Sequence, residues 1–483
     1  MKINSKLILT VIFLLTLFFR LYISFTNSSF SNDDSYFNLR LTHHIINTKT
    51  PLTYDDLSYG GRKIIYPQVF NYFLAAFSFI PGYEKIIPAL LSSLIVIIVY
   101  LISKKISEND IAALFAALFA AFIPIEIKTT INQISVYSLV IPIILLMILS
   151  ILNLEKKKYF VLFIILSFLL PLIHPISILF LFSLIFYLIL LNTESININK
   201  LKKEALSFSL FVIAIINFFL YKNALLRYGT NLIWQNIPSN LFSTYFQTFN
   251  ILEALYLIGV LPLIFGVIGI YFGLFKKKES NIILLSSFIL STLLLMSLKL
   301  INMQIGILFI SLPLVIASSK SLSNIYYYFS LTKFLKFKKY FNIILFVLTI
   351  SLLVIPSVLL AISLPNYNPE IKVFSWFKDN TPENSVALVP FDLGNLLTYF
   401  GERKNVADDN FLLAPNVKER LDDIDLIYKS AFQFKRIELI KKYNINYVYF
   451  PDNLVEKYGV NKNQIKEDNC FKIIREDVYE FKC

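Results

Sequence analysis

The sequence predicts a polytopic α-helical membrane protein with a separate C-terminal soluble α/β domain. Its 483 residues are 56% hydrophobic and only 16% charged, whereas an ordinary soluble protein carries about 25% charged residues. The apolar residues gather in runs long enough to cross a bilayer until about residue 365, where charges become dense and apolar runs shorten to strand length. The net charge of +13 comes from short basic clusters between apolar runs, which indicates membrane topology rather than nucleic-acid binding.

An apolar helix needs about 20 residues to cross the hydrocarbon layer of a membrane. The segments that meet this requirement number about eleven: 7–25, 84–103, 110–127, 135–153, 159–173, 175–191, 205–221, 251–275, 281–298, 301–318 and 341–363. The first of them lacks a small-residue cleavage site, so we expect an anchor that is kept rather than a signal that is removed. Residues 67–80 are apolar but short, which predicts an interfacial or re-entrant helix.

The basic clusters indicate the orientation of these spans. With a cytoplasmic N-terminus and strict alternation, five clusters fall on the inner side: Lys104–Lys105, Lys156–Lys158, Lys200 to Lys203, Lys276–Lys278, and Lys320 with Lys333–Lys339. This agrees with the retention of Lys and Arg on the cytoplasmic side. The predicted organisation is a transmembrane domain over residues 1–364 with an outer loop at 26–83, and an outer soluble domain over 365–483.

The soluble domain shows the pattern of a small α/β fold. A helix followed after a short loop by a strand is an αβ unit, and a hairpin can close the sheet. The expected elements are a helix at Glu370–Lys378, a strand at Ser385–Phe391, a helix at Arg436–Tyr443, a strand at Asn446–Phe450, and a hairpin of Phe471–Ile474 with Val478–Phe481.

The only two cysteines, Cys470 and Cys483, flank this hairpin. A two-residue turn at residues 476–477 pairs Arg475 with Val478 and places the cysteines opposite each other, within disulfide reach. A longer turn would shift the register by one residue, because Glu-Asp is not a favoured type I′ turn. The sequence therefore predicts a disulfide, with two unrelated thiols as the alternative.

The outer loop after the first span holds the densest polar sequence, from Asn32 to Arg62. A carboxylate at a membrane surface, such as that of Asp34, can bind a divalent cation or take a proton from an acceptor. Arg62 can pair with a phosphate group. The alternative interpretation is that the adjacent aspartates only cap the next helix.

Three parts of the chain resemble the catalytic subunits of oligosaccharyltransferases, of archaeal or bacterial type. The segment Asp34–Arg40 resembles that family's first-loop motif, and Trp376–Glu383 resembles the segment that opens its soluble domain. The segment Phe391–Gly394, followed by Leu397–Arg403 and Val406–Asn410, is similar to the region around the signature Trp-Trp-Asp-Tyr-Gly.

The resemblance implies a multi-pass membrane glycosyltransferase of the GT-C fold. Such an enzyme would transfer sugar from a polyprenyl-phosphate-linked donor to an acceptor protein or glycan on the outer face. The resemblance further implies that Asp34 is catalytic and helps bind a divalent cation, Mg²⁺ or Mn²⁺. It places Asp392 and Gly394 on the signature's Asp and Gly, as candidate substrate-binding residues.

The sequence also departs from the family pattern. The signature tryptophans are replaced by Pro390 and Phe391, and the tyrosine by Leu393. Proline and phenylalanine cannot donate the indole hydrogen bond with which the family recognises the hydroxyl residue of the Asn acceptor sequon. In the turn after the third span, where the family has a second acidic motif, only Glu126 offers a carboxylate for a cation.

His174 lies between Pro171 and Pro175 in an apolar turn, where it would contact a donor phosphate or simply shape the turn. Two other functions stay open. One is a noncatalytic homologue that binds lipid-linked glycans, which the degenerate signature favours. The other is a lipid-sugar flippase or transporter, which would need charged residues within spans that are nearly free of them.

Overall fold

The computed structural model describes residues 4–65, 67–234, 237, 246, 250–332, 337–412, 414–430, 432–451, 454, 470–475 and 477–483. The chain divides into two compact units. The helical unit comprises residues 1–27, 76–222 and 245–364, and the α/β unit comprises residues 28–75, 223–244 and 365–483. The C-terminal residues thus form one unit with most of the first loop, which the sequence analysis had grouped with the membrane spans.

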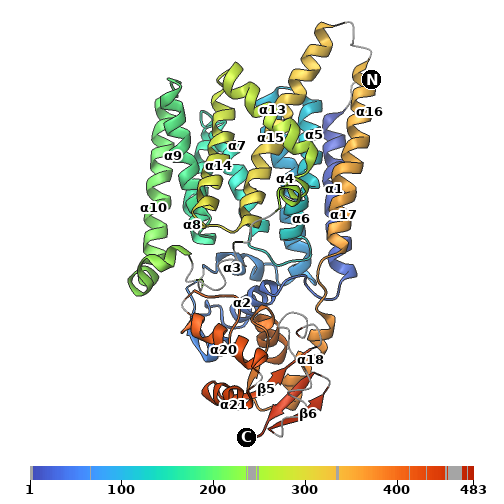
Figure 1. Ribbon diagram of the computed structural model, residues 1–483. Coiled ribbons are helices and arrows are strands. Elements are labelled where there is room, and N and C mark those ends of the chain that lie inside the picture. The colour runs from blue at the N-terminus through green and yellow to red at the C-terminus, as the bar shows by residue number, and fades with distance from the viewer. Residues whose placement is uncertain are drawn as a thin grey trace. The chain divides into compact units, whose positions relative to one another are not determined.

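Each segment that the sequence predicts as a span coincides with a helix or with a broken helix (Figure 1). These are α1 (Ser5–Thr26), α4 (Tyr83–Ser107), α5 (Asp110–Ala121) with α6 (Pro124–Thr130), α7 (Tyr137–Ile151), α8 (Lys157–Ile173), α9 (Ser177–Thr193), α10 (Lys200–Tyr228), α12 (Ile251–Ile258) with α13 (Val260–Tyr271) and η4 (Phe272–Lys276), α14 (Ser280–Ser297), α15 (Met303–Leu331), and α16 (Lys338–Thr349) with η6 (Ile350–Val354) and α17 (Ile355–Ile362). Among the described residues, six helices are long and apolar enough to cross a membrane, or up to eight if each bent pair is one span. The basic cluster that begins at Lys333 lies partly outside the described residues.

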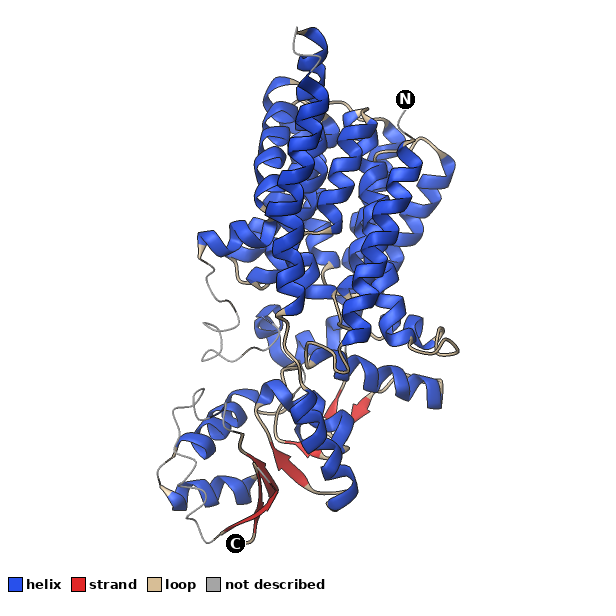
Figure 2. Cartoon of the chain, turned by 90° about the vertical axis from the view of Figure 1, so that its right-hand side faces the viewer, coloured by secondary structure: helices blue, strands red, loops and turns tan. Residues whose placement is uncertain are grey.

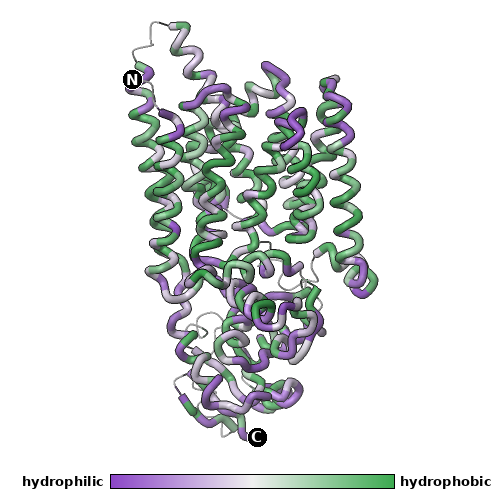
Figure 3. Tube along the Cα trace, turned by 180° about the vertical axis from the view of Figure 1, so that it is seen from behind, coloured by the Kyte–Doolittle hydropathy of each residue, from purple (hydrophilic) through white to green (hydrophobic). Residues whose placement is uncertain are grey.

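The helices of this unit consist mostly of hydrophobic residues, as the hydropathy colouring in Figure 3 shows. Large apolar side chains such as Phe18 on α1 and Ile362 on α17 are more than 60% exposed, as suits contact with lipid. Inside the unit, small residues let helices approach closely. A Cβ atom on Gly266 or Gly269 of α13 would lie within 2.5 Å of a backbone oxygen of α15.

The α/β unit contains a mixed five-stranded sheet in the order β4-β3-β5-β7-β6 (Figure 2). Strand β3 is parallel to β4 and β5, whereas β7 is antiparallel to β5 and β6. The strands are β3 (Val386–Leu388), β4 (Lys404–Asn405), β5 (Ile445–Tyr449), β6 (Phe471–Arg475) and β7 (Val478–Phe481), and the main helices are α18 (Asn368–Asn380), α20 (Val417–Lys429) and α21 (Gln433–Lys442). The predicted α/β class is confirmed, including the α21–β5 unit, although β3 is shorter than expected and α20 was not predicted.

The segments that carry the candidate site are short. Between β3 and β4 the chain forms η7 (Phe391–Leu393), α19 (Gly394–Leu396) and η8 (Leu397–Gly401). The first loop contributes α2 (Asp34–Thr48), β1 (Tyr54–Asp55), η1 (Ser58–Gly60), β2 (Arg62–Lys63) and α3 (Val69–Ala75). The last of these is the short helix that the apolar residues 67–80 predict.

Aromatic side chains fill the core of the α/β unit. Phe374 and Phe377 on α18 are fully buried. Their rings contact those of Tyr449 and Tyr447 on β5, with centroids 5.2 and 5.7 Å apart. Burial of a large aromatic side chain is worth about 1.5–3 kcal/mol, so these contacts fix α18 against the sheet.

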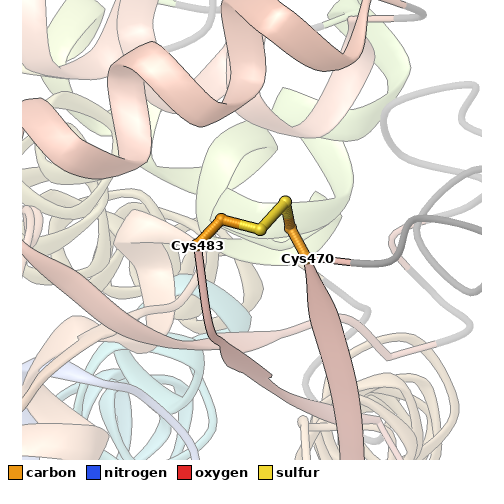
Figure 4. Close-up of a disulfide and its surroundings, with 2 residues drawn as sticks. All are labelled: Cys470 and Cys483. Carbon is orange, nitrogen blue, oxygen red and sulfur yellow. A yellow bond between two sulfur atoms is a disulfide. The ribbon is translucent and has the colours of Figure 1, made fainter.

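The disulfide between Cys470 and Cys483 is present (Figure 4), with the Cα atoms 5.2 Å apart. Arg475 pairs with Val478 as the predicted turn requires, but Ile473 pairs with Tyr479, so the register shifts by one residue between them. The predicted pairing of the cysteines is therefore confirmed, whereas the register beyond Arg475 is wrong by one residue. Glu476 lies outside the described residues.

We expect the double variant Cys470→Ser/Cys483→Ser to lower the free energy of unfolding of the α/β unit by about 3 kcal/mol. A disulfide that closes a loop of this size restricts the unfolded chain by roughly that amount. Denaturant unfolding of the full-length protein, followed through Trp376 fluorescence, measures the change. Reduction of the wild-type protein should give the same loss, and an unchanged unfolding midpoint in both would contradict the prediction.

Candidate active site

The first loop is folded by its own charged residues. Arg40 on α2 makes a bidentate ion pair with Asp55, one arm of which measures 2.8 Å. The same carboxylate accepts the backbone N–H groups of Leu57 and Ser58 at 3.1 and 3.3 Å, which forms the turn after β1. Asp55 therefore serves the loop fold rather than a ligand.

The folded loop is joined to the segment that follows β4. The Ser58 hydroxyl donates to the Asp408 carboxylate at 2.5 Å, and the Tyr59 hydroxyl donates to the Asp408 carbonyl at 2.6 Å. The Tyr59 amide donates to the Asn405 side chain at 2.8 Å. These bonds bring together two regions of the chain that each resemble a functional motif of one family.

Arg62 lies in the same contact and is almost fully buried. Its guanidinium donates to the Asn410 carbonyl and lies 3.5 Å from the Asp408 carboxylate, and it stacks over Tyr59 with 5.4 Å to the ring centroid. A buried arginine needs such partners because an unpaired charge is costly to bury. The structure thus places the predicted phosphate partner against Asp408, beside the first loop.

Asp34 is the first residue of α2, and its side chain is exposed. Desolvation by the surrounding protein raises the pKa of Asp34 to about 6, and the negative charge of Asp408 contributes to this shift. Burial also raises the pKa of Asp409 well above its usual value, and the charges of Asp34, Asp33 and Asp408 raise it further. The structure therefore gathers four carboxylates whose charges act on one another, with that of Asp34 accessible to a ligand.

Asp33 differs from its neighbour because it is buried. One carboxylate oxygen accepts the backbone N–H of Asn395 at 3.0 Å and its side-chain N–H at 2.8 Å, and the other accepts the backbone N–H of Leu396 at 2.7 Å. Burial raises the pKa of Asp33, and these three N–H donors oppose the shift. The side chain of Asp33 therefore does not cap α2, as the alternative interpretation of the sequence required, and caps the segment that begins with α19 instead.

The signature-like segment contributes Asp392 and Gly394. Asp392 is exposed, whereas Gly394 is buried against the chain after β4. A Cβ atom on Gly394 would lie 2.6 Å from the Ala407 carbonyl oxygen and 2.7 Å from the Asp408 Cβ atom. The glycine is required for this close approach, and its carbonyl accepts the Asn405 side chain at 3.2 Å.

We expect Gly394→Ala to lower the free energy of unfolding by about 1–3 kcal/mol, because a methyl group at this position overpacks the contact with Ala407 and Asp408. Denaturant unfolding of the full-length protein measures the loss. The control is Gly60→Ala, since open space surrounds a Cβ atom at Gly60 and only its positive φ adds strain. Equal stability of Gly394→Ala and wild type would contradict the prediction.

Glu126 lies in the helical unit, on α6, and is fully buried. It forms an ion pair with Arg20 of α1, and Thr130 donates to its carboxylate at 2.8 Å. Arg20 also donates to the Thr130 hydroxyl at 2.9 Å. The predicted cation ligand therefore already has a counter-ion. Arg20 could not be predicted as that counter-ion, because it is a single charge within an apolar run.

His174 lies between α8 and α9. Its Nδ1 atom accepts the backbone N–H of Ile176 at 3.1 Å, and its ring contacts that of Tyr137 with 5.2 Å between centroids. The first contact lies within the turn and occupies one ring nitrogen, and the second joins the turn to α7.

The donor set can be compared with the divalent cation that the resemblance implies. Across the described ranges, no group of three or more His, Cys, Asp or Glu side chains is placed to hold a metal ion. The carboxylates of Asp33 and Asp408 accept N–H and O–H groups on both oxygens, and that of Glu126 is paired with Arg20. The described residues therefore show no complete ligand set for the cation.

Residues 5–132 match the model of the family described as oligosaccharyl transferase STT3, N-terminal. This match covers only the N-terminal part of the chain. A comparison with curated protein sequences gives no match.

Solved structures are similar over nearly the whole chain. The Archaeoglobus fulgidus oligosaccharyltransferase matches with a TM-score of 0.66 and 15% identity, over 92% of this chain and 69% of that one. The same archaeal enzyme, AglB, has been solved with an inhibitory peptide and a dolichol-phosphate, and matches with a TM-score of 0.67. ArnT from Cupriavidus metallidurans bound to undecaprenyl phosphate matches with a TM-score of 0.56 and 10% identity, over 99% of this chain and 98% of that one. These likenesses establish the GT-C fold.

Proposed function

We propose that this protein is a membrane glycosyltransferase that moves a sugar from a polyprenyl-phosphate-linked donor to an acceptor on the outer face of the membrane. The observation that carries the proposal is the exposed carboxylate of Asp34, set beside Asp408 and Asp409 in a chain of GT-C fold. The family match over residues 5–132 supports the reaction class. The donor class is supported by the dolichol-phosphate and undecaprenyl phosphate bound in the similar structures.

In this proposal Asp34 is the general base. The bond between the sugar's anomeric carbon and the phosphate oxygen breaks, and a bond to the acceptor nucleophile forms. Asp34 takes the proton that the nucleophile loses, and the polyprenyl phosphate leaves with the bonding electrons. A pKa of about 6 suits this role, because roughly nine in ten molecules then hold the base ionised at pH 7.

The remaining candidates take supporting roles. Arg62 is assigned to the donor phosphate, with Asp408 as the counter-ion that holds it in place. Asp392 is exposed in the middle of η7 and is assigned to the acceptor side. His174 is assigned to the lipid donor through the ring nitrogen that does not accept the Ile176 N–H. Mg²⁺ or Mn²⁺ belongs to the family resemblance, and no step here depends on either.

The orientation follows from two independent features. Five basic clusters agree with a cytoplasmic N-terminus. The disulfide between Cys470 and Cys483 favours an oxidising side of the membrane for the α/β unit, since the cytosol keeps thiols reduced. We therefore place the α/β unit, and with it the proposed site, on the outer face.

We expect acceptor choice to be independent of the hydroxyl residue in an Asn-x-Ser/Thr sequon. Pro390 and Phe391 stand where the family has tryptophans, and neither donates the hydrogen bond that selects the hydroxyl. Rates of transfer to Asn-x-Thr and Asn-x-Ala peptides should agree within about twofold. A strong preference for the threonine peptide would contradict this expectation.

The proposed function is tested with the full-length protein in lipid nanodiscs. The donor is a radiolabelled dolichyl-phosphate hexose, and the acceptors are an asparagine peptide and a glycolipid. Transfer of label to either acceptor supports the proposal. Binding of the donor without transfer would indicate a noncatalytic lipid-glycan binder, and movement of the donor across sealed vesicles without transfer would indicate a flippase.

A further inference from the structure

Asp33 joins two parts of the α/β unit that are far apart in sequence. Its partners Asn395 and Leu396 follow it by 362 and 363 residues. It is 6% exposed, although Asp34 beside it is exposed. A side chain buried so completely next to an accessible one has a role inside the protein.

The contact has the chemistry of a helix cap. The first N–H groups of a helical segment lack partners within the segment, and a carboxylate is a favoured acceptor for them. Asp33 supplies that acceptor to the segment that begins at Gly394 and ends at Gly401. Because Asp33 directly precedes α2, the two helical segments are held together at their N-termini.

Asn395 extends the contact to the segment after β4. Its side-chain N–H group donates to Asp33 at 2.8 Å and to Asp409 at 2.8 Å. Asn395 is fully buried, so both carboxylates take the bond in a site with little competition from water. Asp33 and Asp409 therefore share one donor, and Asp34 lies in the chain directly after Asp33.

We propose that Asp33 is a positioning residue of the site: through its hydrogen bonds to Asn395 and Leu396 it holds the start of α2 on the signature-like segment and so fixes Asp34 beside Asp408 and Asp409. This inference rests on the proposed function, in which Asp34 is the base. Both carboxylate oxygens of Asp33 accept N–H groups of Asn395 and Leu396, so its effect is transmitted through the position of Asp34.

The charged and titratable groups around Asp33 determine what its removal does. Asp34 follows it on α2, Asp409 lies across Asn395, and the hydroxyls of Tyr36 and Tyr367 sense its charge. Its negative charge contributes to the raised pKa of Asp409, which in turn is linked to Asp34. Removal of that charge is therefore expected to make the remaining carboxylates easier to ionise.

The test uses the full-length protein with three variants: Asp33→Asn, Asn395→Ala and the double variant. Asp33→Asn removes the charge and replaces one acceptor with an N–H group that faces two donors. Asn395→Ala keeps the two backbone caps and removes the side-chain bonds to both Asp33 and Asp409. Asp56→Asn, an exposed first-loop residue, makes the same chemical change outside the contact and is the control.

Two measurements are made on each variant. Amide hydrogen exchange of residues 394–401 should quicken by about tenfold or more in Asp33→Asn and stay unchanged in Asp56→Asn. The kcat for sugar transfer should fall by about tenfold or more in Asp33→Asn, while KM for the dolichyl-phosphate hexose stays within about twofold. The double variant should resemble Asp33→Asn, because the two residues act through one contact.

Unchanged hydrogen exchange in Asp33→Asn would overturn the proposal, and so would quickened exchange with an unchanged kcat, which marks a purely structural cap. Additive effects in the double variant would overturn it as well. Should the wild-type protein fail to transfer sugar, the proposed function fails, and the positioning role fails with it. The hydrogen-exchange result would then still show whether Asp33 anchors residues 394–401.

Discussion

Asp34→Asn is expected to lower the rate of sugar transfer by about 100- to 10,000-fold, the usual range for loss of a general base. Asparagine has nearly the shape of aspartate but cannot accept a proton at neutral pH. Because the Asp34 side chain is exposed, the variant should keep its thermal stability to within about 0.5 kcal/mol. The change therefore separates the chemistry of the site from its folding.

The pH profile of the wild-type protein also reports on the Asp34 carboxylate. The raised pKa means that the carboxylate is protonated below about pH 6, so kcat should fall on the acid side of that value and level off above it. In Asp34→Asn the residual rate should no longer fall on the acid side of about pH 6. Transfer at the wild-type rate in Asp34→Asn would remove the residue from the mechanism, whatever the pH profile shows.

Arg20→Ala is expected to lower the free energy of unfolding by about 3–5 kcal/mol. The arginine is 2% exposed, and its loss leaves the fully buried Glu126 carboxylate without its counter-ion. Glu126→Leu should be destabilising to a similar degree, since it leaves the guanidinium unpaired. The double variant Arg20→Leu/Glu126→Leu should recover most of the loss, because neither charge is then buried alone.

Unfolding of these variants in detergent, with transfer activity measured in parallel, distinguishes the ion pair from a cation site. A carboxylate that serves mainly as a cation ligand would lose activity on substitution with little change in stability. The activity would then respond to added Mg²⁺ or Mn²⁺. That outcome would contradict the assignment of Glu126 to Arg20.

The helices and the α/β class could be predicted because their signals are local. The length of an apolar run reports a span directly, and the segment that contains α21 and β5 shows an αβ pattern within about twenty residues. The disulfide was equally tractable, since a chain with two cysteines allows one intramolecular pairing. Only its register was missed, because a shift between Ile473 and Arg475 has no marker in the residues themselves.

The candidate site was predicted in its parts but not in its connections. Asp34 and the segment 406–410 were each recognised, yet nothing in either indicates that Ser58 donates to Asp408 across 350 residues. In the sequence, Asp33 and Asp34 are simply two adjacent aspartates. Only the folded chain shows that Asp33 is buried as a cap. Contacts of this kind depend on tertiary packing, which a single sequence does not display.

The ion pair of Arg20 also bears on how the protein is made. An arginine at the centre of an apolar helix makes insertion into the bilayer less favourable by about 2.5–3.5 kcal/mol, and Arg20, in the last third of α1, makes it less favourable by a smaller amount. Its partner Glu126 follows 106 residues later, so it leaves the ribosome well after α1. We therefore expect α1 to enter the lipid with the charge of Arg20 unpaired and to reach its final packing only after α6 is inserted. Assembly of α1 is then a late event in biogenesis, although α1 is synthesised first.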